Sequence, residues 1–169
     1  MEISLDQLLA SRDDRWHRQR ELLKAYPELT LVCLTVVMPG KVKRNFHSLI
    51  VAQAAITALI NTYGTDIKRL IARDLNTGYE AYAMCDLPID EAKRLAVKIE
   101  DSHELGRLFD IDVISKDGSP VSRQALGLQA RRCLLCEREA RYCMRNHTHT
   151  QEQLQEKLSK MVNDYVQRL

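Results

Sequence analysis

Two aspartates at alternate positions of an apolar run are the residues best suited to chemistry. The run reads "LFDIDVI" and contains Asp110 and Asp112. Side chains two residues apart in a β-strand project from the same face, so the carboxylates should point together while Phe109, Ile111 and Val113 pack. Two neighbouring carboxylates repel each other, and a divalent cation removes that conflict. Because Mg²⁺ accepts carboxylate and phosphate oxygens, the pair predicts half of a phosphoryl- or nucleotidyl-transfer site.

A strand with a solvated face carrying two acids explains the same pattern, and the pair alone does not separate these interpretations. The neighbouring residues favour the functional one. Gly106 and Arg107 precede the strand, and a loop containing glycine follows it. Glycine lets backbone N–H groups approach a phosphate, and arginine neutralises its charge.

A second set of reactive side chains lies in "SRQALGLQARRCLLCEREARYCMRNHTH". Cys133, Cys136 and Cys143 with His147 form a possible Cys₃His zinc site. A thiol-rich helix that packs into the core explains the cysteines as well, since Cys136, Ala140 and Cys143 share one helical face. We favour packing, and zinc remains the alternative.

Basic residues concentrate around the same regions. A solvated basic face is the simplest interpretation, but arginines near an aspartate pair are typical of a site that holds a polyanion. The candidate phosphate-binding residues are Lys41, Lys43, Gly106, Arg107, Arg123, Arg131 and Arg132.

Bulk properties limit the class of protein. The 169 residues predict one domain, 1–169, and a net charge of +2 is too small to indicate a nucleic-acid surface. No signal-peptide pattern is seen, and the longest apolar run is interrupted by Gln53 and too short for a bilayer. We therefore expect a cytoplasmic protein without a membrane partner, in which the five cysteines are thiols or metal ligands.

The elements that must position these residues follow from periodicity and caps. Ser4 and Gln7 form a capping box for a helix to about Ala25, and Thr150 with Gln153 forms another for the long C-terminal helix. Between them we expect a strand over 29–40, a helix over 45–63, a hairpin around Asn76-Thr77-Gly78, a helix over 88–100 and the aspartate strand. Periodicity is weak over 121–149. This order predicts a mixed α+β domain.

Read together, three stretches resemble the holo-citrate lyase synthase family of phosphoribosyl-dephospho-CoA transferases. They are "GRLFDIDVISKDGSPVSR…GLQARRCLLCEREARYCMRNHTH", "VVMPGKVKRN" and "SLDQLLASRDDRWHRQ". The resemblance covers essentially the whole chain. It implies an enzyme that takes triphosphoribosyl-dephospho-CoA as donor and modifies a serine of the acyl carrier (gamma) subunit of citrate lyase, releasing pyrophosphate.

The resemblance also implies nucleotidyltransferase-type chemistry and a nucleotidyltransferase-like fold. Asp110 and Asp112 would hold Mg²⁺, and one of them or a nearby acid would deprotonate the serine. Many enzymes of this chemistry place Gly-Ser before the metal-binding strand and add a third carboxylate, for which Asp117 and Glu80 are the candidates here. The alternatives are a zinc-stabilised module that binds nucleic acid and a docking factor for the carrier subunit without catalysis.

Overall fold

Four antiparallel strands form the sheet that carries the aspartates. The computed structural model describes residues 1–169. The strands are β1 (Thr30–Val36), β2 (Ile67–Leu75), β3 (Gly78–Cys85) and β4 (Phe109–Ile114), in the spatial order β2-β3-β1-β4. Every neighbouring pair is antiparallel.

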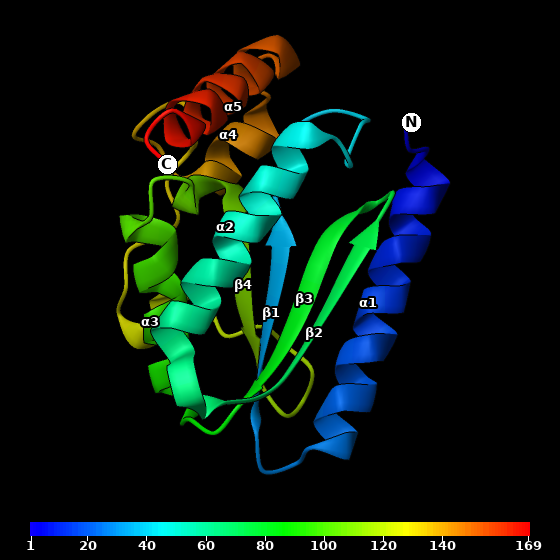
Figure 1. Cartoon of the computed structure of the whole chain (residues 1–169), viewed down its shortest axis with the longest axis vertical. Coiled ribbons are helices and arrows are strands. Elements are labelled where there is room, and N and C mark those ends of the chain that lie inside the picture. Colours follow the sequence, from blue (N-terminus) through cyan, green and yellow to red (C-terminus); the bar gives the residue numbers. More distant parts are fainter.

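Two helices connect strands that are not neighbours in the sheet. Helix α2 (Phe46–Tyr63) leads from β1 to β2, and β3 lies between those strands; α3 (Ile89–Ser102) leads from β3 to β4, and β1 lies between them. The connectivity is therefore a pair of interleaved split β-α-β units. The expected α+β class, the expected hairpin and the expected helices are confirmed (Figure 1).

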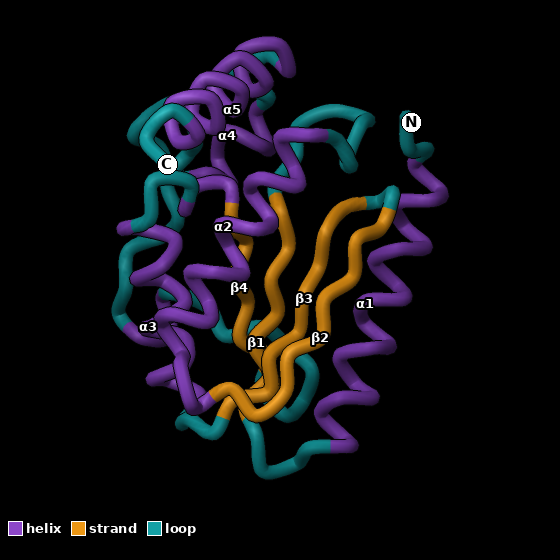
Figure 2. Tube along the Cα trace, in the orientation of Figure 1, coloured by secondary structure: helices purple, strands orange, loops and turns teal.

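Three further helices surround this unit (Figure 2). Helix α1 (Leu5–Ala25) and helix α5 (Gln151–Val166) begin at the two predicted capping boxes. Helix α4 (Ala140–Asn146) lies in the stretch where periodicity is weak, and its seven residues are too few to produce a pattern. Short 3₁₀ turns occupy Gly64–Asp66, Gly106–Leu108 and Gln124–Leu126.

The two faces of the sheet are covered differently. Alternate residues such as Leu34 of β1 and Ile111 of β4 pack with α2, α3 and α5 in the larger core. The opposite residues, including Cys33 of β1, meet α1 in a smaller cluster that includes Leu22. Leu22 is the only buried residue of α1, although sheet residues on this face such as Tyr82 and Met84 are buried.

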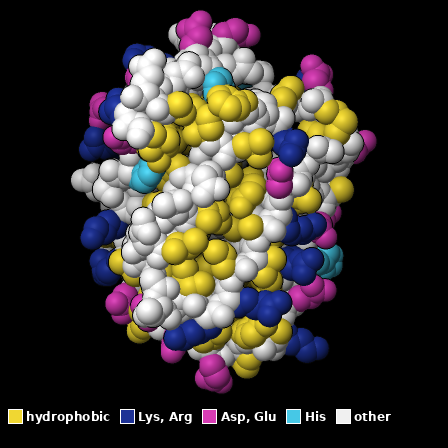
Figure 3. Space-filling model, in the orientation of Figure 1, with side chains coloured by type: hydrophobic (Ala, Val, Ile, Leu, Met, Phe, Trp, Pro, Cys, Tyr) yellow, Lys and Arg dark blue, Asp and Glu magenta, His cyan; other side chains and the backbone are white.

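The length of helix α2 contradicts the expectation that the longest apolar segment is too short to cross a membrane. With the turn that follows, it spans 21 residues at a mean hydropathy of 1.2, which is long and apolar enough to cross a membrane, so the expected limit was wrong. In the structure Val51 and Leu59 bury one side of α2 in the larger core, while Phe46 and Ile60 are exposed. Figure 3 shows this apolar stripe on the face of the molecule that α2 covers. We interpret α2 as a core helix.

Side chains and a return segment protect the free edge of β4. The Ile111 N–H donates to Oε1 of Glu100 at 2.8 Å, and Nζ of Lys93 approaches the Ile111 carbonyl at 3.4 Å. Further along, the Val121 N–H donates to the Val113 carbonyl at 2.8 Å. An unpaired strand edge is thereby satisfied from α3 and from the chain after β4, and β4 is held in place.

Candidate active site

The aspartate pair projects from β4 toward the α1 face of the sheet. Phe109, Ile111 and Val113 are buried on the other face, as predicted. Asp110 and Asp112 are half-buried, and the side chain of Asp110 is 48% exposed. The alternation of β4 therefore delivers two carboxylates to one accessible surface.

The environment of Asp112 is unfavourable for an unpaired carboxylate. Burial raises the pKa of Asp112, and the neighbouring charge of Asp110 raises it further, while Lys93 and Arg131 oppose the shift. Asp112 accepts no hydrogen bond from the protein, whereas Asp110 has Thr35 Oγ1 at 3.5 Å. Two neighbouring carboxylates whose charge is only partly balanced by protein side chains suit a divalent metal such as Mg²⁺.

Arg131 connects the pair to its surroundings. Its Nη1 lies 3.0 Å from Oδ1 of Asp110 and 3.5 Å from Oε1 of Glu100. Its Nη2 donates to the Arg107 carbonyl at 2.7 Å. One predicted phosphate-binding arginine is thus placed directly at the aspartates.

Arg123 occupies a more internal position. Its guanidinium pairs with the buried carboxylate of Glu100 and, at 3.0 Å, with Asp101. Only 9% of Arg123 is exposed. These contacts tie the loop after β4 to α3, and a phosphate-binding role for Arg123 stays a prediction.

The two candidates for a third carboxylate differ in position. Glu80 faces α1 in the same row as Asp110, with Thr35 of β1 between them. It is buried, and its Oε2 accepts from Arg15 at 3.0 Å and from the Tyr82 hydroxyl at 2.7 Å. Its Oε1 is buried without a hydrogen-bond partner, 3.4 Å from Nη1 of Arg73.

Asp117 is exposed in the turn after β4. Hydrogen bonds from Ser115 and Ser119 lower its pKa to about 2 and fix the turn. These contacts give Asp117 a local structural role.

The remaining basic candidates lie further out or make other contacts. Lys43 donates to the Met38 carbonyl at 2.6 Å at the end of β1, and burial lowers its pKa. Lys41 is exposed with Glu2 at 3.9 Å, and Arg132 pairs with Glu137 on the surface.

Gly106 has a clear packing role. A Cβ atom on Gly106 would lie 2.3 Å from the Glu100 carbonyl oxygen, so the turn before β4 packs too closely on α3 for any side chain. This close packing explains why residue 106 is glycine, whether or not a ligand binds there. Contact between Gly106 and a phosphate stays a prediction.

Three cysteines and a histidine meet beside α4. The ligand atoms of Cys133, Cys136, Cys143 and His149 all lie within 4.8 Å of one another. The histidine is His149 rather than the expected His147, because His147 is exposed in a left-handed conformation at the end of α4. The spacing of the cysteines does not show which histidine the backbone brings to them.

The cluster fits a tetrahedral metal ion. The Cys136 and Cys143 sulfur atoms are 3.5 Å apart, and Nε2 of His149 is buried without a hydrogen-bond partner. The Cys133 N–H donates to the Arg138 carbonyl, which closes the loop that carries the first two cysteines. Thiolate and imidazole ligands in this number are typical of structural zinc. The Cys₃His cluster could therefore hold a metal such as zinc.

Several residues of the site were not predicted. Lys93 and Glu100 lie on α3 at a spacing of seven residues, and both are buried against β4. Two charged positions on the buried side of an amphipathic helix were the available signal. Arg15 and Gln19 reach the site from α1, and nothing in their spacing distinguished them from a solvated helix face.

Comparison with known proteins supplies what the geometry alone does not. The family described as apo-citrate lyase phosphoribosyl-dephospho-CoA transferase matches residues 3–165. A probable apo-citrate lyase phosphoribosyl-dephospho-CoA transferase of Vibrio cholerae is 42% identical over 169 residues, covering 98% of this chain and 94% of the relative. An Escherichia coli protein with that name is 37% identical over 168 residues, with 96% and 90% covered.

An α+β domain with an acid pair beside arginines, matched along nearly its whole length by transferases, is itself a transferase. The chain belongs to the apo-citrate lyase phosphoribosyl-dephospho-CoA transferase family.

Proposed function

We propose that this chain attaches phosphoribosyl-dephospho-CoA to the carrier subunit of apo-citrate lyase at the Asp110–Asp112 pair. The family relationship supports the reaction, and the placement of both carboxylates on one accessible face supports the site. The donor is triphosphoribosyl-dephospho-CoA, and the acceptor is a serine of the carrier subunit.

The reaction is of nucleotidyltransferase type. The serine oxygen forms a bond to the α-phosphorus of the donor, the bond from that phosphorus to the pyrophosphate oxygen breaks, and pyrophosphate leaves. One of the two carboxylates accepts the serine proton. The likeness of the fold to nucleotidyltransferases is part of this proposal and rests on the acid pair in a strand.

Asp110 and Asp112 would hold Mg²⁺, which when bound supplies charge neutralisation for the phosphates. Arg131 is placed to exchange its contact with Asp110 for a contact with phosphate, since both are anionic oxygens within reach of one guanidinium. Lys43 and Arg107 are proposed as further cations for the phosphates. The buried charges of Lys93 and Glu100 keep β4 in register beneath the reacting groups.

The Cys₃His cluster is proposed to bind zinc as a structural element. It holds the loop that begins with Arg131 and joins it to α4. We also propose a cytoplasmic location without a membrane or nucleic-acid partner, which the five unpaired cysteines and the low net charge support.

Intact mass measurement of the carrier subunit tests the reaction. The protein is mixed with apo carrier, triphosphoribosyl-dephospho-CoA and Mg²⁺. We expect a mass gain equal to phosphoribosyl-dephospho-CoA that disappears with EDTA and with Asp110→Asn. A gain that survives both treatments would move the site elsewhere, and carrier binding without any gain would favour the non-catalytic docking factor.

A further inference from the structure

A cavity of about 500 Å³ lies between the second half of α1 and the turn after β4. Its lining includes Trp16, Arg20 and Lys24 from the helix and Lys116 and Gly118 from the turn. Cavities of this size accommodate small ligands and cofactors. None of the residues assigned above to the acid pair or to the Cys₃His cluster lines it.

The cavity combines an aromatic ring with positive charge. Cζ of Arg20 lies 4.8 Å from the centroid of the Trp16 ring, and the Trp16 side chain is half exposed. A Cβ atom on Gly118 would lie 3.4 Å from Nη1 of Arg20, so this guanidinium fills the space between the ring and the turn. A nucleobase stacks on such an aromatic and guanidinium surface.

Lysines surround the same cavity. Lys24 lies one turn beyond Arg20 on α1, and Lys116 donates to the Pro27 carbonyl at 2.5 Å, which joins the turn to the end of the helix. Glu21 is the one acid in the lining, against Arg20, Lys24 and Lys116. The excess of positive charge suits a diphosphate.

The cavity lies close to the aspartate pair on the same face of the sheet. Cys33 is the cross-strand partner of Asp112, and Nε2 of Gln19 lies 3.5 Å from its sulfur atom. Leu23, one helical turn after Gln19, lines the cavity. Lys116 follows Asp112 by four residues, and because the chain turns after Ile114 the two residues are at most roughly 13 Å apart.

We propose that this cavity binds the dephospho-CoA part of the donor, with adenine on Trp16 and the diphosphate between Arg20 and Lys24. The inference rests on the proposed function, because it assigns a place to the part of the donor that does not react. The phosphoribosyl unit would then span the interval between the cavity and Asp112.

The chain contains a single tryptophan, so fluorescence reports directly on the cavity. Dephospho-CoA is titrated into the full-length protein while Trp16 emission is recorded. We expect saturable quenching, at least a tenfold higher Kd for Arg20→Ala, and an unchanged Kd for Lys98→Ala, which removes an exposed charge from α3 on the other face. In the transfer assay Arg20→Ala should raise KM for the donor at least tenfold with little change in kcat.

Asp112→Asn separates this proposal from the proposed function. It should bind dephospho-CoA with the wild-type Kd while transfer is lost. The assignment of the cavity would be overturned if the wild-type protein transfers the group but shows no quenching, or if Arg20→Ala and Lys98→Ala have equal Kd. Either result would leave the proposed reaction unaffected. Quenching that depends on Arg20 without any transfer would support the cavity and remove the proposed reaction.

Discussion

Arg131 and Asp110 form an ion pair in which Nη1 lies 3.0 Å from Oδ1. Arg131 precedes Cys133 by two residues, so one partner belongs to the strand with the acid pair and the other to the loop with the cysteines. Two groups of residues that the sequence suggested separately are thus joined by one guanidinium. The position of the cysteine loop therefore affects the electrostatics of the aspartates.

Asp112→Asn should abolish transfer and leave the protein more stable. We expect the rate to fall roughly 100-fold or more, because the variant loses a carboxylate ligand of the metal that neutralises the phosphates. The Tm of the metal-free protein should rise by a few degrees, since a carboxylate whose pKa is raised destabilises the fold when ionised. Carrier mass and thermal unfolding measure both effects. Asp86→Asn is the control, and a lower Tm for Asp112→Asn would contradict the assigned environment.

As the pH is lowered, activity should be lost at a higher pH than the titration of an ordinary aspartate would predict. Protons stay on Asp112 up to its raised pKa, so the metal-binding form is lost as pH falls through that value. The metal-free protein should become more stable over the same fall in pH, because the folded state binds more protons than the unfolded one. Because metal competes with protons, more Mg²⁺ should shift the acid limb of the rate profile to lower pH. An acid limb independent of Mg²⁺ would argue against Asp112 as a ligand.

Arg131→Gln should slow transfer by roughly tenfold or more, since a cation at the phosphates is removed. The Mg²⁺ concentration for half-maximal rate should fall, because Asp110 no longer pairs with a competing cation. Rates measured over a Mg²⁺ series test both statements. Arg141→Gln removes an exposed arginine of α4 as a control, and equal rates for the two variants would exclude the role of Arg131.

Purified protein should contain one zinc ion per chain. His149→Ala should lose the zinc, whereas His147→Ala should keep it, because only His149 reaches the three cysteines. Removing the metal with a chelator should lower Tm by several degrees, since binding stabilises the folded form alone. Metal analysis and thermal unfolding decide the matter. Zinc retained by His149→Ala but lost by His147→Ala would reverse the ligand assignment.

Gly106→Ala should destabilise the protein by about 1–3 kcal/mol, because an added methyl group overpacks a rigid contact. The methyl carbon would meet the Glu100 carbonyl oxygen at 2.3 Å. Urea unfolding measures the change, with Gly127→Ala as a comparison where only backbone conformation is affected. A loss of transfer without any loss of stability would instead favour contact between Gly106 and phosphate.

The sequence predicted the elements better than their contacts. Capping boxes at Ser4 and Thr150 and the alternation around Asp110 are local signals, and each gave the right element. Arg123 and Arg131 look alike in the sequence, yet one is buried against Glu100 and the other meets Asp110. That difference depends on how the loop after β4 crosses α3, which periodicity does not encode.

The histidine ligand shows the same limit. Spacing led us to expect His147, but His147 takes a left-handed conformation and His149 lies with the three cysteines. Likewise, α1 was foreseen as a helix, but its contribution of Arg15 and Gln19 to the site depends on where it lies against the sheet.

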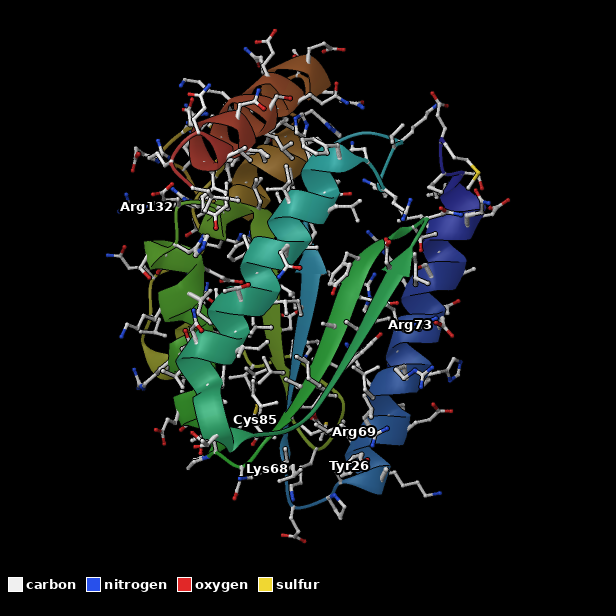
Figure 4. The ribbon with its side chains drawn as sticks, in the orientation of Figure 1. Tyr26, Lys68, Arg69, Arg73, Cys85 and Arg132 are labelled. Atoms are coloured by element: carbon white, nitrogen blue, oxygen red, sulfur yellow. The ribbon has the colours of Figure 1, made fainter.

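The attachment of α1 has a consequence for how the site responds to its surroundings. Besides Leu22, α1 is tied to the sheet by Arg15 with Glu80, by Asp14 with Arg73 and by Tyr26 beneath Arg69. Figure 4 shows Arg73 and Arg69 on β2 next to this helix. Exposed charge pairs weaken as ionic strength rises, whereas the apolar contacts of α2 and α3 do not. A rise in ionic strength should therefore weaken the Asp14–Arg73 pair, which is exposed at Asp14, and with it one side of the proposed donor cavity, while the contact to the buried Glu80 persists.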